Sequence, residues 1–249
     1  VYVGGVFDTI GGTHRTKFAE LDTINGTPTY LDYNIVGNYV DNIILNGHSI
    51  YLSGIFFSVG GQQRHGAAKV SRLSNTVSSW NPNPNYWVRD ISLYDGKIFL
   101  GGTFTHLGSQ YRNHIAAVDT TLGTPLNWNP DVDDAVNPIA IKGGKIYVGG
   151  KFSNISGVNI SKLAAIDINT GLLTGWDSRV YCSPFNCEIF DIQIKGDHIY
   201  PLGEFQGISL PYYYLGFFKK LIVLDVNTGF YVDKIPVNRT TGGAMFISE

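Results

Sequence analysis

Three arginine side chains could bind an anion together. Arg15, Arg64 and Arg112 each lie eight residues after a phenylalanine that recurs along the chain. A guanidinium group forms paired hydrogen bonds with a carboxylate or a phosphate, which predicts a basic rim for an acidic ligand. Alternatively, each arginine bonds a backbone carbonyl or an acid of a neighbouring repeat, and we favour this structural interpretation. Ile160 replaces arginine in the fourth copy of the repeat.

A run of aromatic residues could stack on a ligand. It lies in residues 207–218, which belong to a segment five residues longer than its counterparts. Aromatic loops on a rigid scaffold are typical of carbohydrate stacking and of the dominant residues in protein interfaces. The alternative is packing against a neighbouring loop or a flanking domain. The predicted ligand-binding residues are Tyr212, Tyr213, Tyr214, Phe217, Arg15, Arg64 and Arg112.

The two cysteines predict a disulfide close to this aromatic segment. Cys182 and Cys187 are the only cysteines of the chain, and without a matching histidine cluster they make a poor zinc site. Their spacing is typical of a small disulfide loop in a secreted protein. The connection from Trp176 to Ile192 that holds them is also five residues longer than its counterparts. We expect both insertions on one face, which is our main hypothesis for a binding site.

Other residues give weaker indications of chemistry. The acidic run Asp131–Asp134 could offer oxygen ligands to calcium, but it lacks the spacing of an EF-hand loop, so we predict an exposed turn and no metal site. The six histidines occupy different repeat positions and form no triad pattern. The unique acids Asp90, Glu188 and Asp191 are weak candidates for a glycosidase pair. We predict no enzymatic activity and no cofactor.

The elements that must position these residues come from five copies of one strand motif. An apolar strand, a glycine and then X-Phe recur at intervals of 48 to 53 residues. Repeats of this length made of short strands are typical of β-propeller blades. Glycine inside a strand permits a bulge or the close approach of another backbone. The motif glycines are Gly5, Gly54, Gly102, Gly150 and Gly203.

The third copy shows the organisation of one blade. Its expected strands are residues 88–93, 98–104, 114–119 and a fourth strand ending at Trp128. Asp95-Gly96 predicts a tight hairpin turn between the first two strands, and a loop through Arg112 leads to the third. The chain is therefore predicted to be an all-β, five-bladed β-propeller of four-stranded antiparallel blades. We expect a single domain over residues 1–249.

Two other repeated residue types have structural interpretations. Aspartates at the end of the third strand can accept hydrogen bonds from the following turn; they are Asp22, Asp119, Asp167 and Asp225. Large aromatic residues on the outer strands are expected to pack between blades. They are Trp80, Trp128 and Trp176, with Tyr30 and Tyr231 in the same role.

The two ends of the chain predict how the ring closes. The sequence starts at a second strand, and residues 243–248 are similar to a first strand. We therefore expect the C-terminal strand to join the N-terminal strands in one shared blade, which protects both edges. Because the chain starts at Val1 rather than Met, we expect a portion of a longer protein with flanking domains.

Composition narrows the range of partners. The formal net charge of −2 gives no attraction to nucleic acids or anionic membranes. No apolar run approaches the roughly 20 residues of a membrane helix. We expect no nucleic-acid partner, no membrane insertion and a secreted or cell-surface location.

Several repeated segments are similar to a known repeat. They are the (Ile/Val)-Tyr-Val-Gly-Gly-X-Phe segments, Gly11-Gly12-X-X-Arg15, Gly60-Gly61-X-X-Arg64, Leu163–Asp167 with Asn169-Thr170-Gly171, and Trp128-Asn129-Pro130. With these segments the chain resembles the bacterial delta-sixty propeller repeat and, more broadly, kelch-type blades. The resemblance covers essentially the whole chain. It implies a propeller of the kind found in large surface, secreted and adhesin-like proteins, and it implies no activity.

The main functional expectation is a non-enzymatic binding or adhesion module that recognises a glycan or a protein. The alternative is a structural repeat domain of a surface filament, appendage or virion, in which the aromatic loop is an assembly contact. A third, weaker possibility is a polysaccharide-active enzyme with acids at a central channel.

Overall fold

The computed structural model describes residues 1–160, 162–181, 187–209, 214–216 and 221–235. The regular structure of this part consists of β-strands, which confirms the all-β prediction. Within the same residues, no helix is long and apolar enough to cross a membrane. The chain forms two compact units, Val1–Asn127 and Trp128–Glu249.

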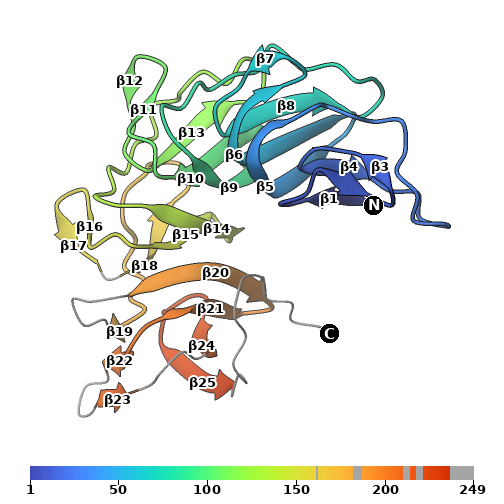
Figure 1. Ribbon diagram of the computed structural model, residues 1–249. Coiled ribbons are helices and arrows are strands. Elements are labelled where there is room, and N and C mark those ends of the chain that lie inside the picture. Colours follow the sequence, from blue (N-terminus) through green and yellow to red (C-terminus); the bar gives the residue numbers. More distant parts are fainter. Residues whose placement is uncertain (161, 182–186, 210–213, 217–220, 236–249) are drawn as a thin grey trace. The chain divides into compact units, whose positions relative to one another are not determined.

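A seven-stranded antiparallel sheet dominates the first unit (Figure 1). Its path runs β13–β10–β9–β6–β5, and β7 and β8 also pair with β6. The strands are β5 (Val36–Asn46), β6 (Ser49–Val59), β7 (Gln62–Gln63), β8 (Ala67–Ser71), β9 (Val88–Tyr94), β10 (Lys97–Gly102) and β13 (Ile115–Asp119). Two copies of the repeat share this sheet, because Gly54 of β6 pairs with Val88 of β9. Near the N-terminus, β1 (Tyr2–Gly4) and β4 (Phe18–Glu20) form a separate pair.

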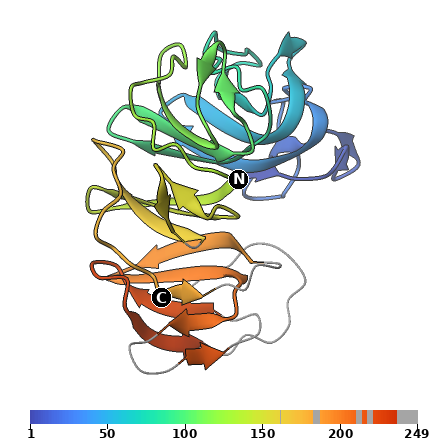
Figure 2. The same cartoon turned by 90° about the vertical axis from the view of Figure 1, so that its left-hand side faces the viewer.

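The second unit repeats the same strand order in two sheets. One contains β14 (Val136–Lys142), β15 (Lys145–Gly150) and β18 (Leu163–Asp167). The other, orange to red in Figure 2, contains β20 (Glu188–Lys195), β21 (His198–Glu204), β24 (Leu221–Asp225) and β25 (Tyr231–Ile235). In each of these sheets the second strand of a copy lies between its first and third strands, as β10 lies between β9 and β13 in the first unit.

A two-residue turn joins the first and second strands, as predicted. Tyr94 pairs with Lys97 across the turn. Asp95 and Gly96 have φ angles of 46° and 69°, and positive φ at both central residues is what a type I′ hairpin turn requires. This confirms the interpretation of Asp95-Gly96.

Four of the five motif glycines lie against the backbone of the preceding first strand, as predicted. A Cβ atom at Gly102 would lie 2.1 Å from the carbonyl oxygen of Trp87, and one at Gly150 would lie 2.0 Å from that of Ala135. The same approach, at 2.4 and 2.3 Å, recurs at Gly54 and Gly203. Irregular strand register beside these glycines marks a bulge. The motif glycine therefore sets the spacing between the first two strands.

Each copy carries a short hairpin directly after the motif phenylalanine, where the sequence predicted a loop. In the first unit the paired strands are β2 (Thr9–Ile10) with β3 (Thr13–His14), β6 with β7, and β11 (His106–Leu107) with β12 (Gln110–Tyr111). In the second unit they are β16 (Asn154–Ile155) with β17 (Val158–Asn159), and β22 (Gly207–Ser209) with β23 (Tyr214–Gly216). We call these hairpins the arms. The segment that leads into a copy also holds the arm of that copy, as in the bridge of Pro84 with Leu107 and the pairing of β19 (Val180–Tyr181) with β22.

The fourth strand of most copies is shorter than predicted. After β8, β13 and β18 the chain returns in a segment that makes one isolated bridge to the third strand, whereas β25 is a full strand. Two backbone hydrogen bonds hold the segment in the third copy: the N–H of Asp119 to Thr124 at 3.0 Å, and the N–H of Leu126 to Ala117 at 2.8 Å. Pro125 between them has no N–H to extend the ladder.

The tryptophans of the outer segments are buried, as predicted. Trp80 is fully buried, and its indole Nε1–H donates to the carbonyl of Asp119 at 2.8 Å. The corresponding bonds, at 3.1 Å each, join Trp128 to Asp167 and Trp176 to Asp225. Tyr231 packs against the core of the second unit. Each tryptophan thus fastens one copy to the end of the third strand in the next.

In the first copy the prediction for Tyr30 is wrong. Its side chain is 65% exposed, whereas the next residue, Leu31, is buried. The hydroxyl of Tyr33 donates to the carbonyl of Ser71 at 2.6 Å, which replaces the indole hydrogen bond of the other copies. The reason is a shift of one residue, because Leu31 and Trp80 lie at the same distance from their motif phenylalanines.

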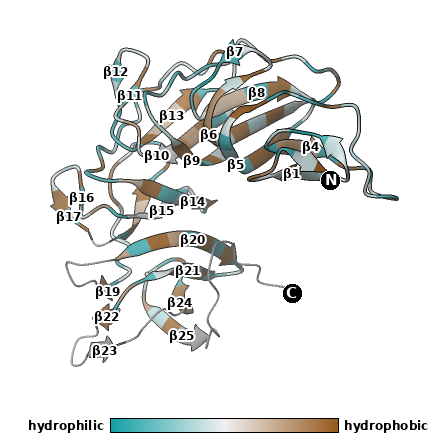
Figure 3. Cartoon of the chain, viewed as in Figure 1, coloured by the Kyte–Doolittle hydropathy of each residue, from teal (hydrophilic) through white to brown (hydrophobic). Residues whose placement is uncertain are grey.

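Apolar residues of the second and third strands form the cores. Ile98, Leu100 and Ala116 are fully buried in the first unit, and their strands carry hydrophobic stretches in Figure 3. Ile146 and Val148, which correspond to Ile98 and Leu100, are fully buried in the second unit. The number of blades and the single domain stay predictions, and the expected closing strand, residues 243–248, lies outside the described residues.

Candidate functional site

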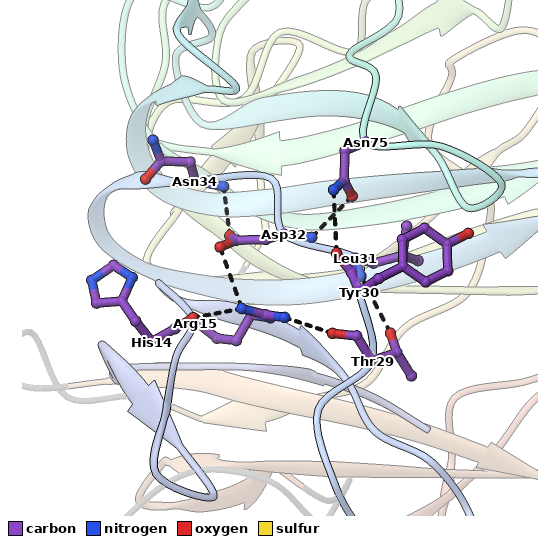
Figure 4. A network of polar contacts seen from close by, with 8 residues as sticks. All are labelled: His14, Arg15, Thr29, Tyr30, Leu31, Asp32, Asn34 and Asn75. Carbon is purple, nitrogen blue, oxygen red and sulfur yellow. Dashed lines mark hydrogen bonds and ion pairs between the residues drawn. The ribbon is translucent and has the colours of Figure 1, made fainter.

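The predicted arginines bind backbone carbonyls inside their own copy of the repeat. Arg15 follows β3 and donates Nη2 to the carbonyl of Thr29 at 2.6 Å and Nη1 to that of His14 at 2.7 Å. Asp32 lies 3.5 Å from the same Nη1 and accepts a hydrogen bond from the N–H of Asn34. Figure 4 shows this guanidinium between the arm and the outer segment. Arg15 therefore fastens the arm to the rest of the copy.

The other two arginines repeat this geometry. Arg64 donates to the carbonyls of Gln63 and Ser78 at 2.7 Å each, and Arg112 makes the corresponding two bonds at 2.8 Å each. Only 7% of Arg64 is exposed, and burial lowers the pKa of its guanidinium group. The structural interpretation accounts for these contacts, while anion binding by the three arginines stays a prediction.

The repeated aspartates accept hydrogen bonds from turns, as predicted. The carboxylate of Asp119 accepts from the N–H groups of Thr121, Leu122 and Thr124 at 2.7 Å each. Burial acts to raise the pKa of Asp119, but these hydrogen bonds outweigh it and lower the pKa to about 2. Backbone hydrogen bonds also lower the pKa values of Asp22, Asp167 and Asp225. These acids stabilise turns.

The arm of the fifth copy departs from the others. Ser209 pairs with Tyr214 across it, so four residues connect β22 and β23, whereas Gly108 and Ser109 alone connect β11 and β12. Buried Ile208 anchors the base of the arm by pairing with Val180. Of the predicted aromatic residues, Tyr214 begins β23. Tyr212, Tyr213, Phe217 and Cys182 lie outside the described residues, so the disulfide between Cys182 and Cys187 stays a prediction.

The first strands of the first unit carry a polar network. Arg89 donates Nη1 to the hydroxyl of Tyr39 at 2.5 Å and lies 4.0 Å from the carboxylate of Asp41. Burial raises the pKa of Asp41 to about 6, although Arg89 acts to lower it. Asn42 donates its side-chain amide to Asp90. Asp90 therefore has an amide partner on the neighbouring first strand.

A similar contact occurs in the second unit. Asn137 of β14 donates to the carboxylate of Glu188 at 2.6 Å, and Lys151 lies 3.4 Å from the other oxygen of this carboxylate. Gln193 donates to Asp191 at 3.3 Å. The unique acids that the sequence brought forward as weak candidates for catalysis thus have amide or ammonium partners within the fold.

The acidic run before β14 supports the neighbouring arm. Asp133 accepts hydrogen bonds from the N–H groups of Ser153 and Asn154 at 2.8 and 2.9 Å, and Asp134 accepts one from Ala135. In the part of the chain that the structure describes, no group of three or more His, Cys, Asp or Glu side chains could hold a metal ion. These carboxylates serve as acceptors for the backbone.

The structure also brings together three aromatic residues that the sequence analysis did not single out. The rings of Phe57 and Trp87 meet edge to face with centroids 5.6 Å apart, and those of Tyr86 and Trp87 are 4.7 Å apart. Phe57 is 46% and Tyr86 is 52% exposed. We call these residues the aromatic triad. One signal was available: where Phe57 stands, the other copies have Asp8, Thr105, Ser153 and Gln206.

Comparison with known proteins shows that one part of the chain is similar to a β-propeller family. A family described as "Domain of unknown function (DUF5122) beta-propeller" matches residues 95–116. The computationally designed Ika8 protein is 11% identical with a TM-score of 0.47, over 82% of this chain and 63% of the design, so the chain spans less than two thirds of it. The designed Ika4 protein is 12% identical with a TM-score of 0.44, and the similarity covers 71% of this chain and 91% of the design. No curated protein matches the chain. Residues 95–116, from the Asp95-Gly96 turn into β13, are thus similar to a propeller-type repeat.

Proposed function

We propose that this chain is a non-enzymatic extracellular binding or adhesion module that recognises a glycan or a protein. Its scaffold is proposed to be a five-bladed propeller of delta-sixty-type repeats. The side chains that recur in three or more copies have contacts within the scaffold: arginines hold the arms, aspartates hold turns and tryptophans fasten successive copies. Recognition is therefore expected from positions that break the repeat.

The lengthened arm of the fifth copy carries this proposal. Its first strand begins two residues after the motif phenylalanine, as β11 does in the third copy, and Ile208 holds its base, yet its connection is four residues long. The sequence around this connection supplies Tyr212, Tyr213 and Tyr214. Aromatic residues on a loop that is positioned by a rigid scaffold suit stacking on a sugar or insertion into a protein partner.

The ring is proposed to close by pairing of residues 243–248 with β1. A motif glycine of a complete copy faces the backbone of a first strand, but among the described residues a Cβ at Gly5 would meet only the ring of Phe7, at 3.7 Å. A first strand formed by residues 243–248 would fill this place. In the alternative function, a structural repeat domain of a filament, a second copy would supply that strand.

Substitution of Gly5 tests the closure. If a strand lies there, Gly5→Ala lowers the unfolding temperature as strongly as the same change at Gly102 does. An unchanged unfolding temperature would contradict the closure. Concentration-dependent self-association of the wild-type chain, measured by sedimentation, would favour the filament.

A glycan array tests the binding role. The wild-type chain is compared with a variant in which Tyr212, Tyr213 and Tyr214 are all alanine, and with Tyr94→Ala as an exposed aromatic control in the first unit. Loss of binding in the triple variant alone supports recognition by the fifth-copy arm. Undiminished binding by a folded triple variant would reject that arm as the site.

A further inference from the structure

The backbone on both sides of Trp87 holds the aromatic triad in place. The carbonyl of Trp87 accepts a hydrogen bond from the N–H of Thr103 at 3.0 Å. The side-chain oxygen of Asn85 accepts from the N–H groups of Thr105 and His106 at 2.9 and 3.0 Å, which fastens the segment before Trp87 to the β11–β12 arm. The rings are therefore presented in a fixed arrangement, and little ordering is needed when a ligand binds.

The scaffold does not account for the triad. Trp87 precedes the residue that pairs with the motif glycine, and the corresponding residues of other copies are Tyr39, Ala135 and Glu188. Because this position carries alanine, tyrosine or glutamate in other copies, the side chain there has no packing role common to the copies, and the scaffold does not require tryptophan. Phe57 and Tyr86 are about half exposed, and adjoining exposed aromatic groups mark interaction sites.

The sequence segments that carry or adjoin the triad contain no formally charged residue, and the nearby Arg89 is bound to Tyr39 and Asp41. Residues 57–63, 81–88 and 105–111 contain no Asp, Glu, Lys or Arg. Gln62 and Gln63 form β7, which pairs with the end of β6 directly after Phe57. Neighbouring Arg64 is buried and bound to carbonyls. The exposed side chains of β7 are thus amides, which both donate and accept hydrogen bonds.

We propose that the aromatic triad binds a neutral saccharide. A pyranose presents an apolar face of C–H groups, which suits the electron-rich face of an indole or phenol ring, and its rim of hydroxyl groups suits the amides of β7. An acidic saccharide or a phosphate would need a free cationic partner. The three segments contain no Lys or Arg, and the nearby Arg64 and Arg89 are bound within the fold. The site is independent of the fifth-copy arm and goes beyond the proposed function, because it names a different site and its ligand class.

Tryptophan fluorescence of the full chain provides a local probe. The chain has four tryptophans. Trp80, Trp128 and Trp176 are 0%, 6% and 5% exposed, whereas Trp87 is partly exposed. Acrylamide quenching therefore reports mainly on Trp87. We expect at least one of cellohexaose, xylohexaose, mannohexaose and chitohexaose, at millimolar concentration, to protect this fluorescence, and oligogalacturonate to give no protection.

Variants then connect binding to the triad. In calorimetric titrations with the protecting saccharide, Trp87→Ala is expected to weaken binding about tenfold or more, and Trp87→Phe less. Tyr94 lies at the opposite end of β9, is 42% exposed, and serves as the matched control: Tyr94→Ala keeps wild-type affinity. Thermal unfolding of each variant checks that the fold is intact.

The outcomes separate this site from the fifth-copy arm. Saccharide binding that is lost in Trp87→Ala and kept in the triple tyrosine variant supports the triad. The inference is overturned if no neutral saccharide protects the folded wild-type chain, if only oligogalacturonate does, or if Trp87→Ala binds as the wild type does. It is also overturned if only a protein partner engages Trp87.

Discussion

Replacing the motif glycine Gly150 by alanine tests the role of the repeat directly. The added Cβ would lie 2.0 Å from the carbonyl oxygen of Ala135, and real Cβ atoms essentially never approach another atom closer than 3.0 Å. One backbone must therefore move by about 1 Å. The same carbonyl accepts the N–H of Lys151 at 2.9 Å, so the movement also disturbs this hydrogen bond.

The magnitude follows from these two effects. Overpacking of a well-packed interior costs about 1–3 kcal/mol, and a disturbed backbone hydrogen bond adds about 1 kcal/mol. We expect Gly150→Ala to lower the free energy of unfolding by about 3 kcal/mol. For a chain of this size, the unfolding temperature falls by about 2–4 °C for each kcal/mol, which predicts a decrease of about 10 °C.

The assay is urea and thermal unfolding followed by circular dichroism, with Gly175→Ala as the matched control. Gly175 lies in the same unit, and no atom of the described residues lies within 4 Å of a Cβ built there. At an unstrained, open position, replacing glycine by alanine changes the free energy of unfolding by at most about 0.5 kcal/mol, or raises it because alanine lowers the conformational entropy of the unfolded chain. Equal stability of the two variants would refute the reasoning that the motif glycine is required by backbone contact.

Two further perturbations separate structural from ligand-binding roles. Arg64→Ala removes its two hydrogen bonds to backbone carbonyls and is expected to lower the free energy of unfolding by about 2–3 kcal/mol; undiminished stability with loss of ligand binding would contradict the structural role. Asp119 has a folded pKa of about 2, below its ordinary value of about 3.9. Its contribution is therefore present above about pH 4 and lost as the pH falls toward about 2. In urea titrations the stability difference between wild type and Asp119→Asn should shrink over this window, and a difference independent of pH would contradict the argument.

Patterns within one copy were readable from the sequence because their physical causes are local. Asp95-Gly96 has the positive φ angles of a tight turn, and Asp119 bonds the turn that follows it. The motif glycines predict a close approach of another backbone because glycine lacks a Cβ atom. Each of these inferences depends on a residue type whose conformational or hydrogen-bonding preference is strong enough to act alone.

The arms and the aromatic triad could not be predicted in this way. Strands of two residues, such as β11 and β12, are too short to show a periodic pattern, so the sequence predicted a loop in this part of each copy. Phe57 and Trp87 are far apart in the sequence and meet because β6 and β9 pair across two copies. Tyr30 was misassigned because a shift of one residue places Leu31 in the tryptophan position.

Residues that recur in several copies can be distinguished from residues that occur in one copy, and the two groups have different roles. A side chain that appears in successive copies meets the same neighbours each time, so its contacts can be satisfied within the fold, as the bonds of Arg64 and Trp80 are. A residue found in one copy has no such requirement. Phe57 replaces polar residues of the other copies, and Trp87 stands where other copies have Tyr39, Ala135 and Glu188. The fifth-copy arm adds residues to a hairpin that has a shorter connection in the other copies. Exposed aromatic surface is costly in water, so the half-exposed rings of Phe57 and Tyr86 favour a ligand that covers them.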